Sequence, residues 1–312
     1  QYQHIYNLLK EYEASHEPLR IQLLNRCSFR VLQQEKNYWF RFFRRFSQFM
    51  YRQKHYYDHY SNSVFKVIRT LFNYLISERG LPIGEFHRRF RSPAEHFLPV
   101  ILSPGQLRKL ITDKEWEATL SRTMRKVKDF FVFGCTVGLR YADLMQLKKD
   151  HLQYLPEGVS LALHTQKTGA EVRIPLPGYA VEIIKKYSRQ SGRYVLPRMA
   201  NSNLNLHIKT LVQKAGWDHP LPKIRHRQGE PVEIKTKTGA SWRFYNHITV
   251  HTMRRTAITT LLLMGMDETS VRRISGHAAG SREFYRYVVL VQDYLNLKVR
   301  DAHKRLLEGD IL

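Results

Sequence analysis

The sequence predicts a mainly α protein with a small β-sheet (α+β), built from two domains. Three observations predict this fold class. Apolar residues recur at helical spacing over most of the chain, two short alternating segments flank a glycine-containing turn, and a segment rich in helix breakers divides the chain near its first third. A length of 312 residues is enough for two domains that each bury a core of their own.

Two amphipathic helices are expected in the first domain. Their apolar residues form two sets at helical spacing: Trp39, Phe42, Phe43, Phe46 and Phe49, then Val64, Val67, Ile68, Leu71, Phe72 and Leu75. Ser61 and Ser63 are expected to cap the second helix, and Gly80 with Pro82 to end it. The first set lies on one helix face, so we expect it in a core rather than as a platform for stacked bases.

The linker between the domains is expected near residues 90–103. The segment from Arg88 to Pro93 combines cationic residues with a proline, and Leu98-Pro99 follows. Ser103 and Pro104 then predict a new helix, with serine as the N-cap and proline at the first helical position. The first domain therefore covers residues 1–98 and the second covers residues 99–312.

The second domain is expected to be helical around a short hairpin. The pattern from Lys126 to Leu152 is helical and is interrupted at Gly138. Residues 159–164 and 171–175 alternate as strands on either side of Gln166-Lys-Thr-Gly169, and helices return after Gly178. The polar segment 223–246 has too few periodic apolar residues to predict an element.

The charge of the chain predicts a polyanionic partner. There are 51 basic and 27 acidic residues, which gives a net charge of +24, and residues 1–98 alone hold 16 basic and 8 acidic residues. Nucleic acid is favoured over a membrane because no apolar run approaches the roughly 20 residues that span a bilayer. For Arg41, Arg44, Arg45 and Arg52 two interpretations remain, a solvated helix face or a surface that contacts phosphates.

The cysteines exclude two classes of structure. Cys27 and Cys135 are the only two, and neither has a metal-ligand spacing, so no disulfide framework and no zinc ribbon is expected. A soluble protein of a reducing compartment, the cytoplasm, fits this composition, and no signal-peptide pattern opens the chain. The first residue is Gln1, which is consistent with a fragment or a processed product that lacks an N-terminal segment.

Five short motifs follow one another in the second domain. They are Thr136-Val-Gly-Leu-Arg140-Tyr-Ala-Asp143, the hairpin with Lys167 followed by Arg173-Ile-Pro-Leu176, His251-Thr-Met-Arg254, Ser275-Gly-His277, and Phe284-Tyr-Arg-Tyr287. Each is weak alone, since Arg140 fits a solvated helix start equally well and Lys167 fits an exposed hairpin lysine. In this order the set resembles the tyrosine recombinase (phage-integrase) family from near Leu102 to near Arg300, and most of all integrases of conjugative or mobilisable elements.

The first domain also resembles a part of that family. The stretch from Tyr60 to Gly80 is similar to the family's helical core-binding domain, which binds DNA. The resemblance implies a site-specific recombinase that cuts and rejoins double-stranded DNA through a 3′-phosphotyrosyl intermediate. It further implies a homo-tetramer on paired sites, and it is compatible with accessory DNA-bending proteins as partners.

The resemblance implies a catalytic set whose members suit the chemistry of phosphodiester cleavage. The set is Arg140, Lys167, His251, Arg254, His277 and Tyr287. Two guanidiniums suit a bidentate clamp on the nonbridging oxygens, and a lysine can protonate the leaving 5′ oxygen. His251 is the candidate base, His277 the hydrogen-bond donor to the phosphate, and Asp143 a brace. No cofactor and no metal ion is expected.

Three questions stay open at this point. In the family the nucleophile usually lies nine residues after the Gly-His histidine, whereas Tyr285 lies eight and Tyr287 ten residues after His277. The pattern Phe284-x-Arg-Tyr287-Val favours Tyr287, and Tyr285 remains the alternative. A type IB topoisomerase-like nicking and resealing enzyme and a non-catalytic DNA-binding accessory protein remain the alternative functions. The apolar stretch 291–312 docks either on a neighbouring protomer or on its own domain.

Overall fold

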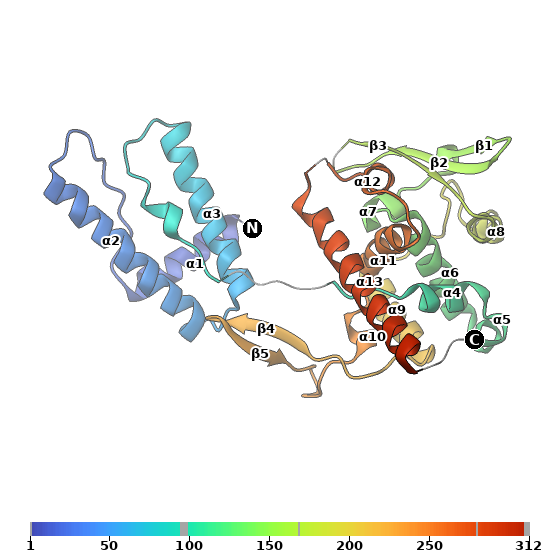
Figure 1. The fold of residues 1–312 in the computed structure, drawn as a ribbon. Coiled ribbons are helices and arrows are strands. Elements are labelled where there is room, and N and C mark those ends of the chain that lie inside the picture. Colours follow the sequence, from blue (N-terminus) through green and yellow to red (C-terminus); the bar gives the residue numbers. More distant parts are fainter. Residues whose placement is uncertain (1, 94–98, 168, 279, 309–312) are drawn as a thin grey trace. The chain divides into compact units, whose positions relative to one another are not determined.

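The chain forms two compact units. The computed structural model describes residues 2–93, 99–167, 169–278 and 280–308. The first unit combines the N-terminal residues up to the gap at 94–98 with residues 222–241, and the second unit holds the remainder (Figure 1). Part of the linker predicted near residues 90–103 therefore lies outside the described residues.

The first unit is a small helical bundle with one β-hairpin. Its elements are α1 (Tyr2–Ser15), α2 (Phe29–Gln48), the π-helical turn η1 (Phe49–Gln53), α3 (Asp58–Ser77), the 3₁₀ turn η2 (Phe86–Arg89), β4 (Lys223–Arg227) and β5 (Glu230–Ile234). Ser28 caps α2 by accepting a hydrogen bond from the Val31 amide. The predicted aromatic core is confirmed, because Trp39, Phe42 and Phe46 are all buried.

Two expectations for this unit are wrong. The second helix begins at Asp58 with Tyr57 as its N-cap, and Ser61 lies buried inside the helix instead of capping it. Residues 222–241, which the sequence places with the second domain, pack with the first unit. There β4 and β5 form an antiparallel hairpin that contacts α3.

A buried carboxylate holds this hairpin. Asp58 accepts hydrogen bonds from the Tyr51 hydroxyl at 2.6 Å, the Gln228 amide at 3.0 Å and the Gly229 amide at 2.8 Å. Gln228 and Gly229 both have positive φ, as a tight two-residue hairpin turn requires. The turn therefore presents two backbone N–H groups to one anion, a contact that the polar sequence of this segment does not reveal.

The second unit is mainly helical with one three-stranded sheet (Figure 1). Its elements are α4 (Pro104–Thr112), α5 (Lys114–Thr119), α6 (Arg122–Val137), α7 (Tyr141–Met145), η3 (Lys149–His151), β1 (Leu152–Leu155), β2 (Gly158–His164), β3 (Glu171–Pro175), α8 (Gly178–Tyr187), α9 (Asn201–Lys214), α10 (Phe244–His247), α11 (Val250–Leu263), α12 (Glu268–Ser275) and α13 (Arg282–Glu308). The mainly α fold with a small antiparallel sheet is confirmed.

Several local predictions in this unit are also confirmed. Ser103 caps α4 in a reciprocal capping box with Gln106, and Pro104 is its first residue. The two predicted strands form β2 and β3 and pair antiparallel, with Leu161 opposite Ile174. The sequence did not predict β1, which pairs with β2 at the edge of the same sheet. The central helices α6 and α11 pack on each other in the core.

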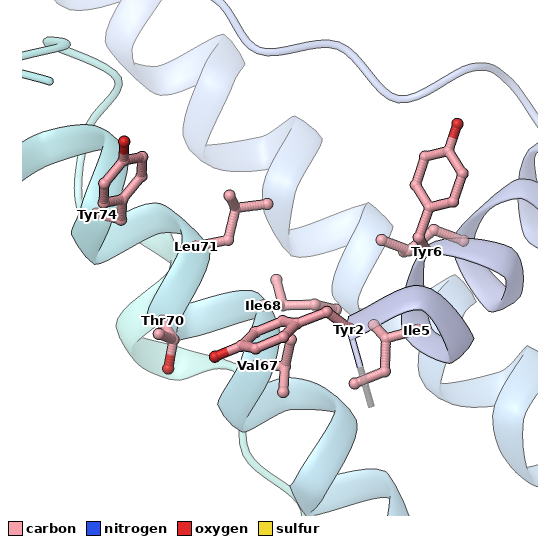
Figure 2. A pocket seen from close by; sticks show the side chains of 9 residues that line it. Tyr2, Ile5, Tyr6, Val67, Ile68, Thr70, Leu71 and Tyr74 are labelled. Atoms are coloured by element: carbon pink, nitrogen blue, oxygen red, sulfur yellow. The ribbon is translucent and has the colours of Figure 1, made fainter.

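One apolar pocket of about 400 Å³ lies in the first unit between α1 and α3. Figure 2 shows its lining of aromatic and aliphatic side chains. The lining residues are Tyr2, Ile5, Tyr6, Leu9, Val67, Ile68, Thr70, Leu71 and Tyr74. It contains no titratable group other than tyrosine, so the chemistry suggested by the motifs must be sought elsewhere. Among the described residues, every helix is too short or too polar to cross a membrane.

Candidate active site

The candidate site lies where the C-terminal end of α6 packs on α11. Gly138 ends α6 in the left-handed conformation, with φ of 64°, and a Cβ there would lie 3.1 Å from the Ala257 Cβ. This close approach places the Gly138 carbonyl 2.9 Å from Nη1 of Arg254, which donates to it. Arg254 is only 5% exposed. Its guanidinium is therefore held from behind by backbone.

Arg140 enters the site from the N-cap position of α7. Its Nη1 is buried and has no hydrogen-bond partner among the described residues, and the same holds for Oδ2 of Asp143 one turn later. A buried donor without a partner costs roughly 1–3 kcal/mol. Such a cost is tolerated where a ligand supplies the missing acceptor, and an anionic oxygen is the acceptor that a guanidinium prefers.

The two guanidiniums repel each other. Burial, followed by the charge of Arg140, lowers the pKa of Arg254 to about 10, and Tyr287, Asp143 and Glu283 act in the opposite direction. The pKa is still high enough for Arg254 to stay protonated at neutral pH. The site therefore holds two like charges that an anion between them would stabilise.

His277 lies at the end of α12 and contacts Arg254. The helix ends at Gly276 in the left-handed conformation, and the imidazole that follows has Nδ1 at 2.8 Å from Ser275 Oγ. Nη2 of Arg254 lies 3.1 Å from Nε2 and 3.2 Å from Nδ1. Burial, then the charges of Arg254, Arg140 and Arg272, lower the pKa of His277 to about 3. The ring is neutral at pH 7.

His251 is on the first turn of α11, three residues before Arg254 and so on a neighbouring position of the same helix. Its side chain reaches solvent. Partial burial of the ring, then the charges of Arg255, Arg254 and Arg140, lower its pKa below the usual value. A neutral imidazole with solvent access can accept a proton, which a general base requires.

The structure separates the two candidate tyrosines. The Tyr287 ring is partly buried, with its centroid 6.0 Å from that of His277 and 6.2 Å from that of Phe284. The negative charge that Tyr287 carries when ionised raises the pKa of Arg254, which requires proximity to the guanidinium. Tyr285 is 62% exposed on another face of α13. Only Tyr287 belongs to the cluster of cationic residues.

Lys167 lies exposed on the β2–β3 hairpin, outside the contacts that join the other five residues. Asp143 fixes the base of this hairpin, because its Oδ1 accepts a hydrogen bond from the Gln166 amide at 2.9 Å. A Cβ on Gly276 would lie 3.3 Å from Cγ2 of Thr165, so the same hairpin base also packs closely on the end of α12. The adjacent Thr168 lies outside the described residues.

The six predicted residues thus fall into two groups. Arg140, His251, Arg254, His277 and Tyr287 influence one another electrostatically or by contact, while Lys167 is on the hairpin beside them. The sequence did not assign roles to Gly138 and Ser275, which hold Arg254 and His277. Ser275 lies in a short motif beside the His277 that it supports, whereas Gly138 lies beside Arg140 and far in sequence from Arg254. Within the described residues, no group of three or more His, Cys, Asp or Glu could hold a metal ion.

Solved structures with the same fold are recombinases and integrases. The XerH site-specific recombinase in a post-cleavage complex with a palindromic difH substrate has a TM-score of 0.58 at 14% identity, and the match covers 81% of this chain and 70% of that one. A lambda integrase dimer bound to a COC′ core site has a TM-score of 0.51 at 12% identity, with 90% of this chain and 76% of that one covered. At these identities the likeness shows the fold.

Sequence comparison shows the family. The tyrosine recombinase XerD of Listeria monocytogenes serotype 4b (strain F2365) is 24% identical over 243 residues, which cover 76% of this chain and 72% of the relative. Residues 106–290, more than half of the chain and all five motifs, match the model of the phage integrase family. The chain therefore belongs to the phage integrase family of tyrosine recombinases, site-specific recombinases that break and rejoin DNA strands.

Proposed function

We propose that Tyr287 of this recombinase attacks a DNA phosphodiester that Arg140 and Arg254 clamp, while His251 and Lys167 move the protons. One observation carries this assignment of roles. A guanidinium nitrogen of Arg140, buried and without a partner among the residues that the structure describes, belongs to the same cluster as Arg254, His277 and the Tyr287 ring. A phosphate is the ligand that would complete this arrangement.

Charge develops on the phosphate oxygens during attack, and the clamp is suited to stabilise it. The Gly138 carbonyl holds Arg254 in place through Nη1 before any ligand binds. Little reorganisation is then needed when the transition state forms, which is the condition for strong electrostatic stabilisation. Asp143 would serve as a positioning residue, because it joins α7 to the hairpin that carries Lys167.

The proton transfers of the proposed step balance. The Tyr287 oxygen forms a bond to phosphorus and its proton passes to His251, whose lowered pKa leaves the imidazole neutral and able to accept it. The bond from phosphorus to the 5′ oxygen breaks, and Lys167 supplies the proton for that oxygen. A 5′-hydroxyl from a second strand reverses the step and forms the new junction.

The biological setting belongs to the same proposal. The XerH and lambda integrase structures are complexes with DNA, which supports double-stranded DNA as the substrate here. We infer a homo-tetramer on paired sites, with accessory DNA-bending proteins compatible with that assembly, acting on DNA in the cytoplasm. The polar hairpin insert and the Phe-x-Arg-Tyr motif favour an integrase of a conjugative or mobilisable element, and a Tn1549 transposon integrase shares the fold with a TM-score of 0.50.

The test is the formation of a covalent protein–DNA adduct. Duplexes that the full chain selects from a random-sequence library would be nicked at successive positions near the selected motif, so that the cleaved end diffuses away and the adduct accumulates. We expect an adduct with the wild type and with Tyr285→Phe, but none with Tyr287→Phe. An adduct with Tyr287→Phe that Tyr285→Phe lacks would overturn the assignment of the nucleophile.

A second assay separates recombination from simple nicking and resealing. Supercoiled plasmids with and without two copies of the selected motif would be incubated with the protein. We expect strand exchange only when both copies are present. Relaxation of both plasmids at equal rates would instead indicate a topoisomerase-like activity.

A further inference from the structure

We propose that Ser275 is a positioning residue that sets which imidazole nitrogen of His277 carries the proton, and that it reverses its hydrogen bond when a phosphate binds. The state of the free protein follows from the hydrogen-bond geometry and the charges around the ring. The reversal rests on the proposed function, because a phosphodiester is the ligand that it requires.

The hydrogen-bond donors and acceptors around Ser275 determine the tautomer of His277 in the free protein. Ser275 is 1% exposed, and its Oγ lies 2.6 Å from the Val271 carbonyl oxygen and 2.8 Å from Nδ1 of His277. A carbonyl oxygen can only accept, and a hydroxyl has a single hydrogen to donate. The hydroxyl therefore donates to Val271, and its oxygen accepts the hydrogen of Nδ1.

The other ring nitrogen is then an acceptor. Nη2 of Arg254, which can only donate, lies 3.1 Å from Nε2 and 3.2 Å from Nδ1, and with the hydrogen on Nδ1 only Nε2 has a lone pair to accept from it. The charged groups that influence the ring are Arg254 on α11, Arg140 before α7 and Arg272 on α12, and Tyr287 on α13 packs against it. Three cations oppose a second proton, so the ring is neutral with hydrogen on Nδ1.

This tautomer cannot donate to a phosphate oxygen through Nε2. A neutral ring can do so only if its hydrogen is on Nε2 and Nδ1 has a lone pair. Ser275 can stabilise that second state by turning its hydroxyl from Val271 to Nδ1, while Arg254 turns Nη2 to the phosphate. One proton leaves Nδ1 and one arrives at Nε2 through water, so the protein gains no net proton. The position thus requires a side chain that both accepts and donates.

Nitrogen-15 NMR of the imidazole tests both states. The full chain would be labelled at histidine, His277 would be assigned from the signals lost in His277→Gln, and Tyr287→Phe would prevent cleavage. We expect hydrogen on Nδ1 in the free protein and on Nε2 when a selected duplex is bound. Hydrogen on Nε2 in the free protein overturns the assignment of that state. A ring that keeps hydrogen on Nδ1, or carries it on both nitrogens, when the duplex is bound overturns the reversal.

The same NMR experiment distinguishes a wrong tautomer assignment from a phosphate that does not bind at this cluster. If Tyr287→Phe binds the duplex and no signal of His277 changes, while the free state is as expected, then the phosphate does not bind at this cluster. In that case the reversal fails together with the proposed site, and the role of Ser275 in the free protein stands. A wrong tautomer in the free protein instead refutes the inference and leaves the clamp untouched.

Substitutions at Ser275 separate positioning from simple packing. In Ser275→Ala we expect mixed tautomers in the free protein and about tenfold slower adduct formation, the value of roughly one hydrogen bond, at nearly unchanged DNA affinity. Ser275→Thr, which keeps the hydroxyl, should restore both properties. Ser281→Ala is the matched control, because Ser281 caps the start of α13 through the Phe284 amide and does not contact the imidazole. Equal slowing in Ser275→Ala and Ser281→Ala, with one tautomer retained, would contradict the proposal.

Discussion

The two arginines of the site are expected to affect the stability of the free protein in opposite ways. Nη1 of Arg140 is buried and has no partner in the described part of the chain, whereas Arg254 satisfies the Gly138 carbonyl and contacts His277. Groups that await a ligand usually destabilise the free protein, while groups that hold other residues stabilise it. The two side chains have the same chemistry and opposite expected effects on folding.

This difference predicts opposite changes in the free energy of unfolding when each arginine is replaced by methionine. Arg140→Met should leave the free energy of unfolding unchanged or raise it by up to about 1 kcal/mol, because it removes a buried unpaired donor. Arg254→Met should lower it by about 2 kcal/mol, because it leaves the Gly138 carbonyl without its charged donor. Denaturant unfolding without DNA measures both values, and both variants should lose adduct formation. A loss of stability in Arg140→Met as large as in Arg254→Met would contradict the prediction.

The low pKa of His277 predicts how stability depends on pH. Burial and three arginines lower the folded-state pKa to about 3, below the unfolded value of about 6.5. The unfolded chain therefore binds a proton first, so this residue's contribution is complete above pH 6.5 and is lost as pH falls toward 3. His277→Gln should show a smaller drop in thermal stability between pH 7.5 and pH 5 than the wild type. An identical drop would show that the imidazole is not neutral in the folded protein.

At the scale of elements, two short hairpins are held in place by carboxylates on helices. The β2–β3 hairpin carries Lys167 and is anchored through Gln166 to Asp143, and the β4–β5 hairpin is anchored through its turn to Asp58. In both cases a carboxylate on a helix accepts from the backbone of the hairpin. The exposed side chain of Lys167 takes no part in this anchor.

The role of the Lys167 hairpin can be tested through the leaving group. A sulfur in place of the bridging 5′ oxygen leaves without protonation, so a general acid is not needed. Lys167→Ala should cleave an ordinary selected duplex at least about 100-fold more slowly and should recover most of the wild-type rate on the sulfur-containing duplex. Arg173, an exposed cation on β3, provides the control. The cleavage rate of Arg173→Ala relative to wild type should be the same on the ordinary and on the sulfur-containing duplex. If the cleavage rate of Lys167→Ala does not recover on the sulfur-containing duplex, the lysine contributes to DNA binding and not to protonation of the leaving group.

The second hairpin predicts a local change in amide exchange. Asp58→Ala removes the acceptor of the Gln228 and Gly229 amides, so we expect both to exchange much faster and the stability of the first unit to fall by roughly 1–3 kcal/mol. Asp113→Ala, which removes the N-cap of α5 in the second unit, is the control and should leave these amides unchanged. Continued protection of Gln228 and Gly229 in Asp58→Ala would show that another contact holds the turn.

The sequence predicted elements with strong local signals and missed those that depend on distant partners. The N-cap at Ser103 and the alternation of β2 and β3 are local, and both were predicted correctly. The start of α3 was misplaced because Asp58 is held by the turn at Gln228, and no local pattern reveals that contact. In the site, the order of motifs indicated which residues meet. The support of Arg254 by a carbonyl depends on a contact between segments that only the folded chain brings together, and that of His277 by Ser275 depends on the turn that ends α12.

At the scale of the whole molecule, the charge surplus predicts DNA binding that depends strongly on salt. The net charge of +24 is spread over both halves of the sequence. On α2 the buried face is aromatic, and Arg41, Arg44 and Arg45 are all exposed on the remaining surface, as is Arg52 just after it. The helix thus presents cations to solvent with few acids beside them. This favours the interpretation of these arginines as a phosphate-contacting surface over that of a merely solvated face.

The salt dependence of DNA binding decides between these interpretations. Each phosphate contact releases about one counterion, so Arg41→Ala and Arg44→Ala should each reduce the slope of log affinity against log salt by about one. Arg88→Ala is the matched control, since Arg88 is exposed in the same unit and already paired with Glu85. Affinity for selected and random duplexes should fall by the same factor if the contacts are to phosphates, and a larger loss for the selected duplex would mean that the arginines read bases. If the slopes for Arg41→Ala and Arg44→Ala equal those of wild type and Arg88→Ala, these arginines form only a solvated helix face.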